Sequence, residues 1–443
     1  MNRSYGPTRQ LLTATRHALL AANARKPLSS SVKASSPVFM LGWPVSELPL
    51  IALAANSLAV TRMLRHGALR SRSGRLSLAA EAVTAANLAD LHRTARASEA
   101  VFEEALVDGL GEGYRRFIGD AGLAFDETPF SRRQTIVPAW ISHRKYIEAG
   151  DVAYGPAGKR NSLDIWRRPD LTSKGSAPVL LQVHGGAWVM GSKRQQAYPL
   201  MSHLTDAGWV CVAINYRLSP KASWPDHIVD VKRAIAWVRE HIADHGGDPD
   251  FIAITGGSAG GHLSSLAALT PNHAPWQPGF EHADTTVQAA VPMYGVYDFL
   301  DWDGQGGPAE TIKFLADKVL KVAPEVDPQL WKDASPISWA NPDAPPMMIV
   351  HGVNDSLAPV DMARRMSDTL RAASGSPVVY AELPRTQHAF DVYSSLRTLY
   401  TVRAVERFLA FVRARALGAP VVDSAGPTVD ERSSENEASR QPA

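Results

Sequence analysis

A serine flanked by glycines is the residue of this chain best placed to do chemistry. The pentapeptide Gly256-Gly-Ser258-Ala-Gly260 follows an apolar run at residues 251–254 and precedes a segment that can begin a helix. In a strand, tight turn and helix of this kind, the serine hydroxyl is exposed and the glycines let strand and helix approach closely. The pattern predicts that Ser258 is a nucleophile; the alternative is an ordinary glycine-rich turn.

An acid and a base follow the serine in the order that hydrolases of this type use, which is serine, acid, histidine. Asp355 comes after the apolar run 345–352, and His388 lies in the loop after the apolar run 378–383. Loops at the carboxyl ends of parallel strands meet at one edge of an open sheet. We therefore expect Asp355 to orient His388, and His388 to act as the base.

Two glycines at another strand end are placed to stabilise charge on a substrate oxygen. The apolar run 177–183 leads directly into His184-Gly185-Gly186-Ala187. Amides of such a loop, together with the amide after the nucleophile, form the oxyanion hole of hydrolases. We expect Gly185, Gly186 and Ala259 to supply these amides, the alternative being a plain strand-to-loop turn. We expect His184 to shape the loop by hydrogen bonding.

Other acidic and histidine residues have weaker claims to these roles. Asp298 and Asp301 follow the apolar run 287–294 and are the rivals of Asp355 as the acid. His351 lies within a predicted strand, and we expect it to pack in the core. The order and strand-end positions of the serine, acid and base together are what favour the first assignment.

The elements that must position these residues alternate along residues 136–417, where short apolar runs are separated by helical segments. This alternation indicates a mostly parallel sheet flanked by helices, the α/β class. Residues 1–135 contain alanine-rich helical stretches, such as 77–110, and no strand-like alternation. Residues 418–443 form a polar tail that we expect to be disordered. The chain is thus predicted to have a helical N-terminal extension, a catalytic domain and a tail.

Composition narrows the classes of function. With 443 residues, 45% of them hydrophobic, the chain can bury a large core. A net charge of +2 gives no reason to expect nucleic acid as a partner. The single cysteine, Cys211, lies in the apolar run 209–214, so we expect an inert buried thiol and no intramolecular disulfide. No cluster of cysteine and histidine suggests a metal site, and we expect no cofactor.

Residues 38–60 form an apolar stretch about long enough to cross a bilayer. Proline and polar residues interrupt it, namely Pro44, Glu47, Pro49 and Asn56. A basic flank that would suit an anionic membrane surface follows at Arg62, Arg65, Arg70, Arg72 and Arg75. Three interpretations of the stretch remain open: a membrane span, a segment on the membrane surface, and a helical hairpin packed on the catalytic domain. Because the stretch begins late, we expect no secretory signal peptide and a cytoplasmic or membrane-associated protein.

Five sequence blocks together resemble the α/β-hydrolase carboxylesterases and lipases related to hormone-sensitive lipase. Across about residues 140 to 416 these blocks are residues 184–188, 215–220, 256–261, 351–355 and 388–390. The resemblance implies an α/β-hydrolase fold and a serine carboxylesterase with a triad of Ser258, Asp355 and His388. The N-terminal extension resembles that of actinobacterial Lip-type esterases.

The resemblance leaves the substrate open. Ala187-Trp188 stands where many members have a third glycine, which leans toward a branch that includes arylformamidases and methylesterases. We expect hydrolysis of small-molecule or lipid esters with short to medium acyl chains; amide cleavage and the hydrolysis of longer acyl lipids are the alternatives. The oligomeric state stays open. Five aromatic residues could line an acyl pocket or pack in the core: Trp188, Trp224, Trp276, Phe299 and Trp302.

Overall fold

The fold is taken from a computed structural model, which describes residues 5–28, 32–118, 146–171, 175–300 and 309–418. The expected boundary near residue 135 lies outside these ranges, and so does the expected tail from residue 419 onward. Trp302 and Asp301 also lie outside them.

A single eight-stranded sheet forms the centre of the catalytic domain, in the order β1-β2-β4-β3-β5-β6-β7-β8. Strands β1 and β2 pair antiparallel with each other and β2 pairs antiparallel with β4, whereas all pairs from β4 to β8 are parallel. This is the expected α/β-hydrolase arrangement. The strands are β1 Ile147–Ala153, β2 Ser162–Trp166, β3 Ala177–Val183, β4 Val210–Ile214, β5 Gly247–Gly257, β6 Ala289–Met293, β7 Met347–Gly352 and β8 Val378–Leu383.

The central strands read as continuous apolar runs because helices cover both faces of the sheet. In β3, Val179 and Leu181 face one core while Leu180 faces the other. Strand β7 begins at Met347, two residues later than the apolar run predicts. Proline has no N–H for the ladder, so Pro345 and Pro346 precede the strand.

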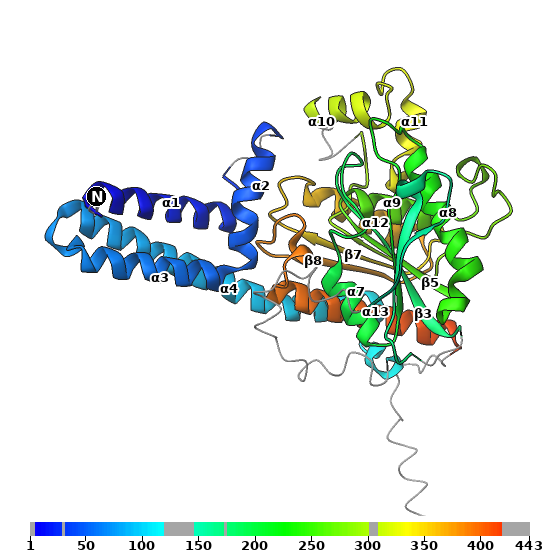
Figure 1. The fold of residues 1–443 in the computed structure, drawn as a ribbon, viewed down its shortest axis with the longest axis horizontal. Helices are drawn as coiled ribbons and strands as arrows, with labels where there is room; N and C mark the ends of the chain where they lie inside the picture. Colours follow the sequence, from blue (N-terminus) through cyan, green and yellow to red (C-terminus); the bar gives the residue numbers. More distant parts are fainter. Residues whose placement is uncertain (1–4, 29–31, 119–145, 172–174, 301–308, 419–443) are drawn as a thin grey trace, which may run out of the picture.

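Helices α8, α9 and α12 pack against one face of the sheet, and α7, α13 and the second half of α4 pack against the other (Figure 1). The bounds are α7 Tyr198–Asp206, α8 Asp226–His241, α9 Ala259–Leu269, α10 Ala309–Phe314, α11 Pro328–Asp333, α12 Val360–Ala373 and α13 Leu396–Ala416.

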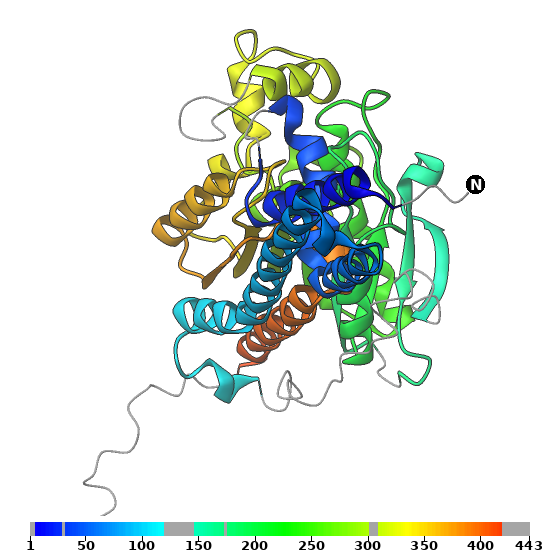
Figure 2. The ribbon, with the colours of Figure 1, turned by 90° about the vertical axis from the view of Figure 1, so that its left-hand side faces the viewer.

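The N-terminal extension is helical, as expected, with α1 Pro7–Arg25, α2 Val32–Glu47, α3 Pro49–Arg65 and α4 Arg72–Leu110. Helix α4 has 39 residues and is about 58 Å long, so it reaches well past the sheet. Helices α1 and α3 pack along its first half, away from the sheet, as both views show (Figures 1 and 2). We call α1, α3 and the first half of α4 the arm.

The apolar stretch 38–60 is divided between α2 and α3, which meet at an angle of 89°. Pro49 is the first residue of α3, where its missing N–H costs no helical hydrogen bond. In the part of the chain described, no single helix is long and apolar enough to cross a membrane. Only α2 and α3 together, as a bent pair, have the necessary length and apolar composition. Helix α2 lies between the arm and the catalytic domain (Figure 1).

Candidate active site

Ser258 lies on the sharp turn between β5 and α9 that its sequence predicts. Its φ and ψ angles are 58° and −123°, a conformation that side-chain-bearing residues rarely adopt. A Cβ at Gly256 would lie 2.5 Å from the carbonyl oxygen of Gly260, and a Cβ at Gly260 would overlap the carbonyl of Val183. The glycines therefore let the chain turn tightly enough to hold the serine at the end of the strand.

Asp355 and His388 lie on the loops after β7 and β8, and the structure brings them together. Nδ1 of His388 is 2.6 Å from Oδ2 of Asp355. The other carboxylate oxygen accepts the backbone amides of Leu357 and Ala358 at 2.9 and 2.8 Å. Asp355 is thus held rigidly and can fix the orientation of the imidazole.

His351 also contacts the acid. As expected it is buried within β7, but its Nε2 lies 3.3 Å from Oδ2 of Asp355 and 2.8 Å from the carbonyl oxygen of Ala358. Burial alone raises the pKa of Asp355, yet the charge of His388 and the hydrogen bond from His351 outweigh it and hold that pKa below its usual value. The carboxylate therefore stays ionised.

The glycine loop lies directly against the serine. A Cβ at Gly185 would be 3.1 Å from the Cβ of Ser258. His184 shapes this loop: it is buried, its Nδ1 is 2.8 Å from the carbonyl oxygen of Gly185, and burial lowers its pKa to about 4. It is therefore neutral and engaged within the loop.

The three amides expected to form the oxyanion hole differ in their partners. The amide of Gly185 donates to Oε1 of Gln196 at 2.7 Å, so Gly185 is already engaged. Ala259 is the first residue of α9, and the amides of the first helical turn have no acceptor within the helix. Gly186, with φ of 127°, follows on the loop. The amides of Gly186 and Ala259 are therefore the better candidates, and Gln196 is a loop-holding residue that the sequence pattern did not reveal.

Ser258 and His388 line one cavity of about 770 Å³. Its remaining walls are largely apolar and come from the glycine loop, from residues 310–315 and from α2. Of the aromatic candidates, Trp188 lines the cavity, whereas Trp224, Trp276 and Phe299 pack in the core. The rival acid Asp298 is absent from the lining, and its side chain accepts the amide of Leu300 at 3.0 Å.

Helix α2 supplies one wall of this cavity through Phe39, Met40 and Trp43. The ring of Phe39 lies edge-on to His388, with ring centres 6.0 Å apart. The indole N–H of Trp43 donates to the carbonyl oxygen of Ala389 at 3.0 Å. The N-terminal extension therefore builds part of the site.

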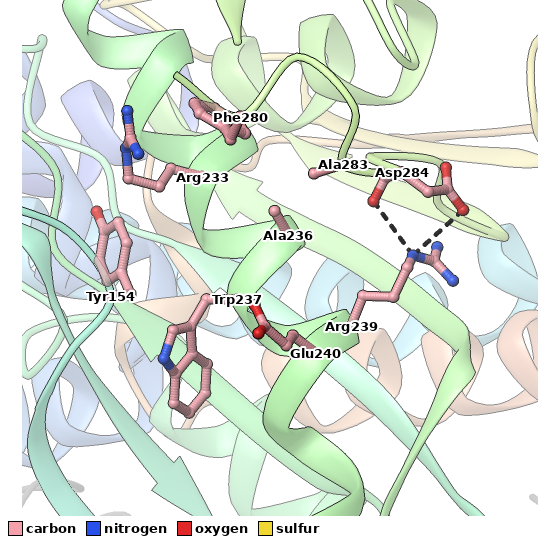
Figure 3. A pocket seen from close by; sticks show the side chains of 9 residues that line it. All are labelled: Tyr154, Arg233, Ala236, Trp237, Arg239, Glu240, Phe280, Ala283 and Asp284. Atoms are coloured by element: carbon pink, nitrogen blue, oxygen red, sulfur yellow. Dashed lines mark hydrogen bonds and ion pairs between the residues drawn. The ribbon is translucent and has the colours of Figure 1, made fainter. Parts of the chain in front are cut away.

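A second pocket, of about 400 Å³, lies on the outer side of α8 (Figure 3). Arg239 pairs with Asp284 there at 3.3 Å, and the guanidinium of Arg233 lies 4.3 Å from the ring centre of Phe280. None of the residues with predicted chemistry lines this pocket. Its charged groups hold neighbouring segments together, and we assign it no function.

Comparison with known proteins identifies relatives along nearly the whole chain. Residues 163–370 match the family model BD-FAE. The probable carboxylic ester hydrolase LipM of Mycobacterium tuberculosis is 49% identical over 411 residues, which cover 91% of this chain and 93% of LipM. Esterase LipQ of the same organism is 47% identical, over 73% of this chain and 77% of LipQ.

A solved structure agrees with the fold. A truncated form of a carbohydrate esterase from gut microbiota is 25% identical, with a TM-score of 0.51, over 59% of this chain and 98% of that one. Since LipM is nearly half identical over almost its full length, the sequence relationship extends through the N-terminal helices as well as the catalytic domain. The chain thus belongs to the Lip-type carboxylic ester hydrolases, within the hormone-sensitive-lipase-like group of α/β-hydrolases.

Proposed function

We propose that this ester hydrolase works through Ser258 as nucleophile, His388 as base and Asp355 as the orienting acid. The observation that supports this most is the 2.6 Å contact between Nδ1 of His388 and Asp355, which leaves Nε2 of the same ring for the serine in the cavity they share. This is the division of roles in a serine triad.

The reaction has two halves in this proposal. Nε2 of His388 accepts the Ser258 proton as Oγ attacks the ester carbonyl, and the same proton passes to the departing alcohol oxygen as the C–O bond breaks. Water then attacks the acyl-serine, giving one proton to His388 and releasing the carboxylic acid as the proton returns to Oγ. The amides of Gly186 and Ala259 stabilise the oxyanion in both halves, and Gly185 keeps the loop in place through Gln196.

We propose acyl esters of short to medium chain length as substrates. A cavity of about 770 Å³ with mostly apolar walls is large for an acetyl ester alone and suits a longer acyl chain. In the same proposal the N-terminal extension, residues 1–135, acts as a cap through α2, residues 136–417 form the catalytic domain and residues 418–443 form a tail.

The test is hydrolysis of p-nitrophenyl esters from acetyl to palmitoyl by the protein and its Ser258→Ala variant. Ser265→Ala is the matched control, because the Ser265 hydroxyl donates to the carbonyl of Gly261 in the same helix and does not line the cavity. We expect the first variant to lose activity on every ester and the control to keep it. Turnover by Ser258→Ala would refute the triad, and cleavage of anilides in preference to esters would favour an amide substrate.

A further inference from the structure

Charge is distributed very unevenly along the chain. Residues 1–83 contain 11 of the 46 lysines and arginines but two of the 44 acidic residues, a net charge of +9, which leaves −7 for the rest. Both acids, Glu47 and Glu81, are buried. The surface of the described part of residues 1–83 therefore presents basic side chains without exposed carboxylates.

The same segment exposes most of the large apolar side chains. Of the 17 that are exposed in the described part of the chain, 13 lie between Leu11 and Val83. Three of these thirteen lie with five exposed arginines at the turn from α3 to α4. This turn is the end of the arm that lies far from the sheet (Figures 1 and 2). The exposed residues at this tip are Arg62, Leu64, Arg65, Leu69, Arg70, Arg72, Arg75 and Leu76.

This combination identifies the partner by its chemistry. A nucleic acid would contact the arginines but would offer the leucines little apolar surface, and a folded acidic protein would need an apolar patch of matching shape beside its carboxylates. A second copy of the arm would bring the same positive charge. The interface of an anionic bilayer accepts both, because leucines enter the boundary of head groups and acyl chains while arginines contact anionic head groups. We infer that the arm binds the surface of an anionic phospholipid bilayer.

Helix α2, which lies between the arm and the catalytic domain, also borders the active-site cavity. Met40 lines the cavity and is 59% exposed, and Met190, on the glycine loop, lines it and is 65% exposed. Two exposed methionines therefore lie at the rim of the cavity, beside the exposed polar residues Ser36, Gln195 and Glu310. This part of the inference rests on the proposed ester hydrolysis. The substrates are then esters held in the bilayer, and they enter the cavity beside α2.

The experiment is sedimentation of the full chain with vesicles of phosphatidylcholine alone and of phosphatidylcholine mixed with phosphatidylglycerol. The test variant is Arg65→Gln/Arg70→Gln/Arg72→Gln, three exposed arginines that pair with no carboxylate in the described ranges. The charge-matched control is Lys159→Gln/Lys318→Gln/Lys332→Gln, three exposed lysines of the catalytic domain. A third variant is Leu64→Ser/Leu69→Ser/Leu76→Ser, and circular dichroism checks that each variant is folded.

We expect wild type and control to bind the mixed vesicles and to bind phosphatidylcholine weakly. The arginine variant should bind the mixed vesicles on the order of a hundredfold more weakly, since each basic residue near such a surface contributes about a factor of five. The leucine variant should also lose affinity. Equal binding by all the variants, or no binding by wild type, would overturn the inference.

Two further outcomes separate this inference from the proposed catalysis. Turnover of soluble p-nitrophenyl butyrate should be the same in wild type and in the arginine variant, because the tip does not line the cavity. If wild type binds vesicles but hydrolyses no ester, the arm inference stands and the catalytic proposal fails. If wild type forms dimers that the arginine variant disrupts, without binding vesicles, the tip is a self-association surface and the inference is wrong.

Discussion

The indole N–H of Trp43 donates to the carbonyl oxygen of Ala389 at 3.0 Å, and Ala389 directly follows His388. Ala389 has a φ of 53°, in the left-handed region that alanine seldom occupies. A helix of the N-terminal extension thus supports a strained peptide next to the proposed base. This contact links the N-terminal extension to the loop that carries the proposed base, in addition to its place in the cavity wall.

Trp43→Phe keeps an aromatic ring in the wall but removes the donor to Ala389. A hydrogen bond of this kind is worth about 0.5–1.5 kcal/mol, so we expect kcat on a soluble ester to fall about two- to tenfold. The matched control is Trp237→Phe, because Trp237 lines the pocket of Figure 3 and its ring stacks on His241, away from the active-site cavity. Steady-state kinetics check this, and an unchanged kcat in Trp43→Phe would show that the bond does not position the histidine loop.

Asp355→Asn should separate Asp355 from its rival Asp298 as the acid. An asparagine cannot stabilise the imidazolium or hold the required tautomer, and such a change costs about ten-thousandfold in kcat in serine proteases. Asp298→Asn is the control, because Asp298 does not line the cavity and its side chain accepts the backbone amide of Leu300. Loss of activity in the Asp298 variant alone would reverse the assignment.

The ionised state of Asp355 also makes stability depend on pH. Its pKa in the folded protein lies below the ordinary 3.8, because the charge of His388 and the bond from His351 outweigh the effect of burial. The unfolded chain therefore binds this proton first as the pH falls, and the stabilisation present above about pH 4 is lost in more acidic solution. Urea unfolding between about pH 5 and pH 3 should show a shallower loss of stability in Asp355→Asn than in wild type; parallel curves would contradict this.

Glu47 and Arg397 form a fully buried ion pair that fastens α2 to the start of α13. Nη1 of Arg397 is 2.9 Å from Oε1 of Glu47, and the hydroxyl of Ser395 donates to the other carboxylate oxygen at 2.9 Å. Burial raises the pKa of Glu47, although the charge of Arg397 opposes this. Burying this pair therefore carries a desolvation penalty, and removing one partner destabilises the fold further because the other charge stays buried alone.

Glu47→Ala should reduce the free energy of unfolding by about 3–5 kcal/mol, because it leaves the guanidinium buried without a counter-ion. The double variant Glu47→Leu/Arg397→Met should lose much less of the free energy of unfolding, because neither charge is left buried alone. Urea denaturation of wild type, Glu47→Leu, Arg397→Met and the double variant measures the coupling between the two residues. If the loss of unfolding free energy in the double variant equals the sum of the losses in the two single variants, the residues do not act as a pair.

The sequence was informative wherever a local pattern decides the structure. A tight turn after an apolar run needs small residues around Ser258, and loops that follow parallel strands had to bring Asp355 and His388 to one edge. Strands β3 and β8 coincide with their predicted runs for the same reason. These features depend on neighbours in the chain or on the topology of a parallel sheet.

Contacts between distant segments could not be predicted in this way. Trp43 and Ala389 are 346 positions apart, and no period in the sequence links them. The apolar stretch 38–60 fitted a span, a surface helix or a hairpin equally well, since hydropathy does not report what a helix packs against. Gln196 was missed because a glutamine that accepts one amide leaves no pattern, although that bond decides the role of Gly185.

Phe39 should limit the length of the acyl chain. Its ring lines the cavity and lies edge-on to His388, so Phe39→Ala opens space in the wall close to the proposed base. Each additional methylene that becomes buried contributes about 0.8 kcal/mol, or roughly fourfold in kcat/KM. We expect the optimum in a p-nitrophenyl ester series to move toward longer chains, while Phe280→Ala, in the pocket of Figure 3, leaves it in place. An optimum that stays fixed in Phe39→Ala would mean that α2 borders the alcohol part of the ester, and that residues of the glycine loop or of the segment 310–315 set the chain length.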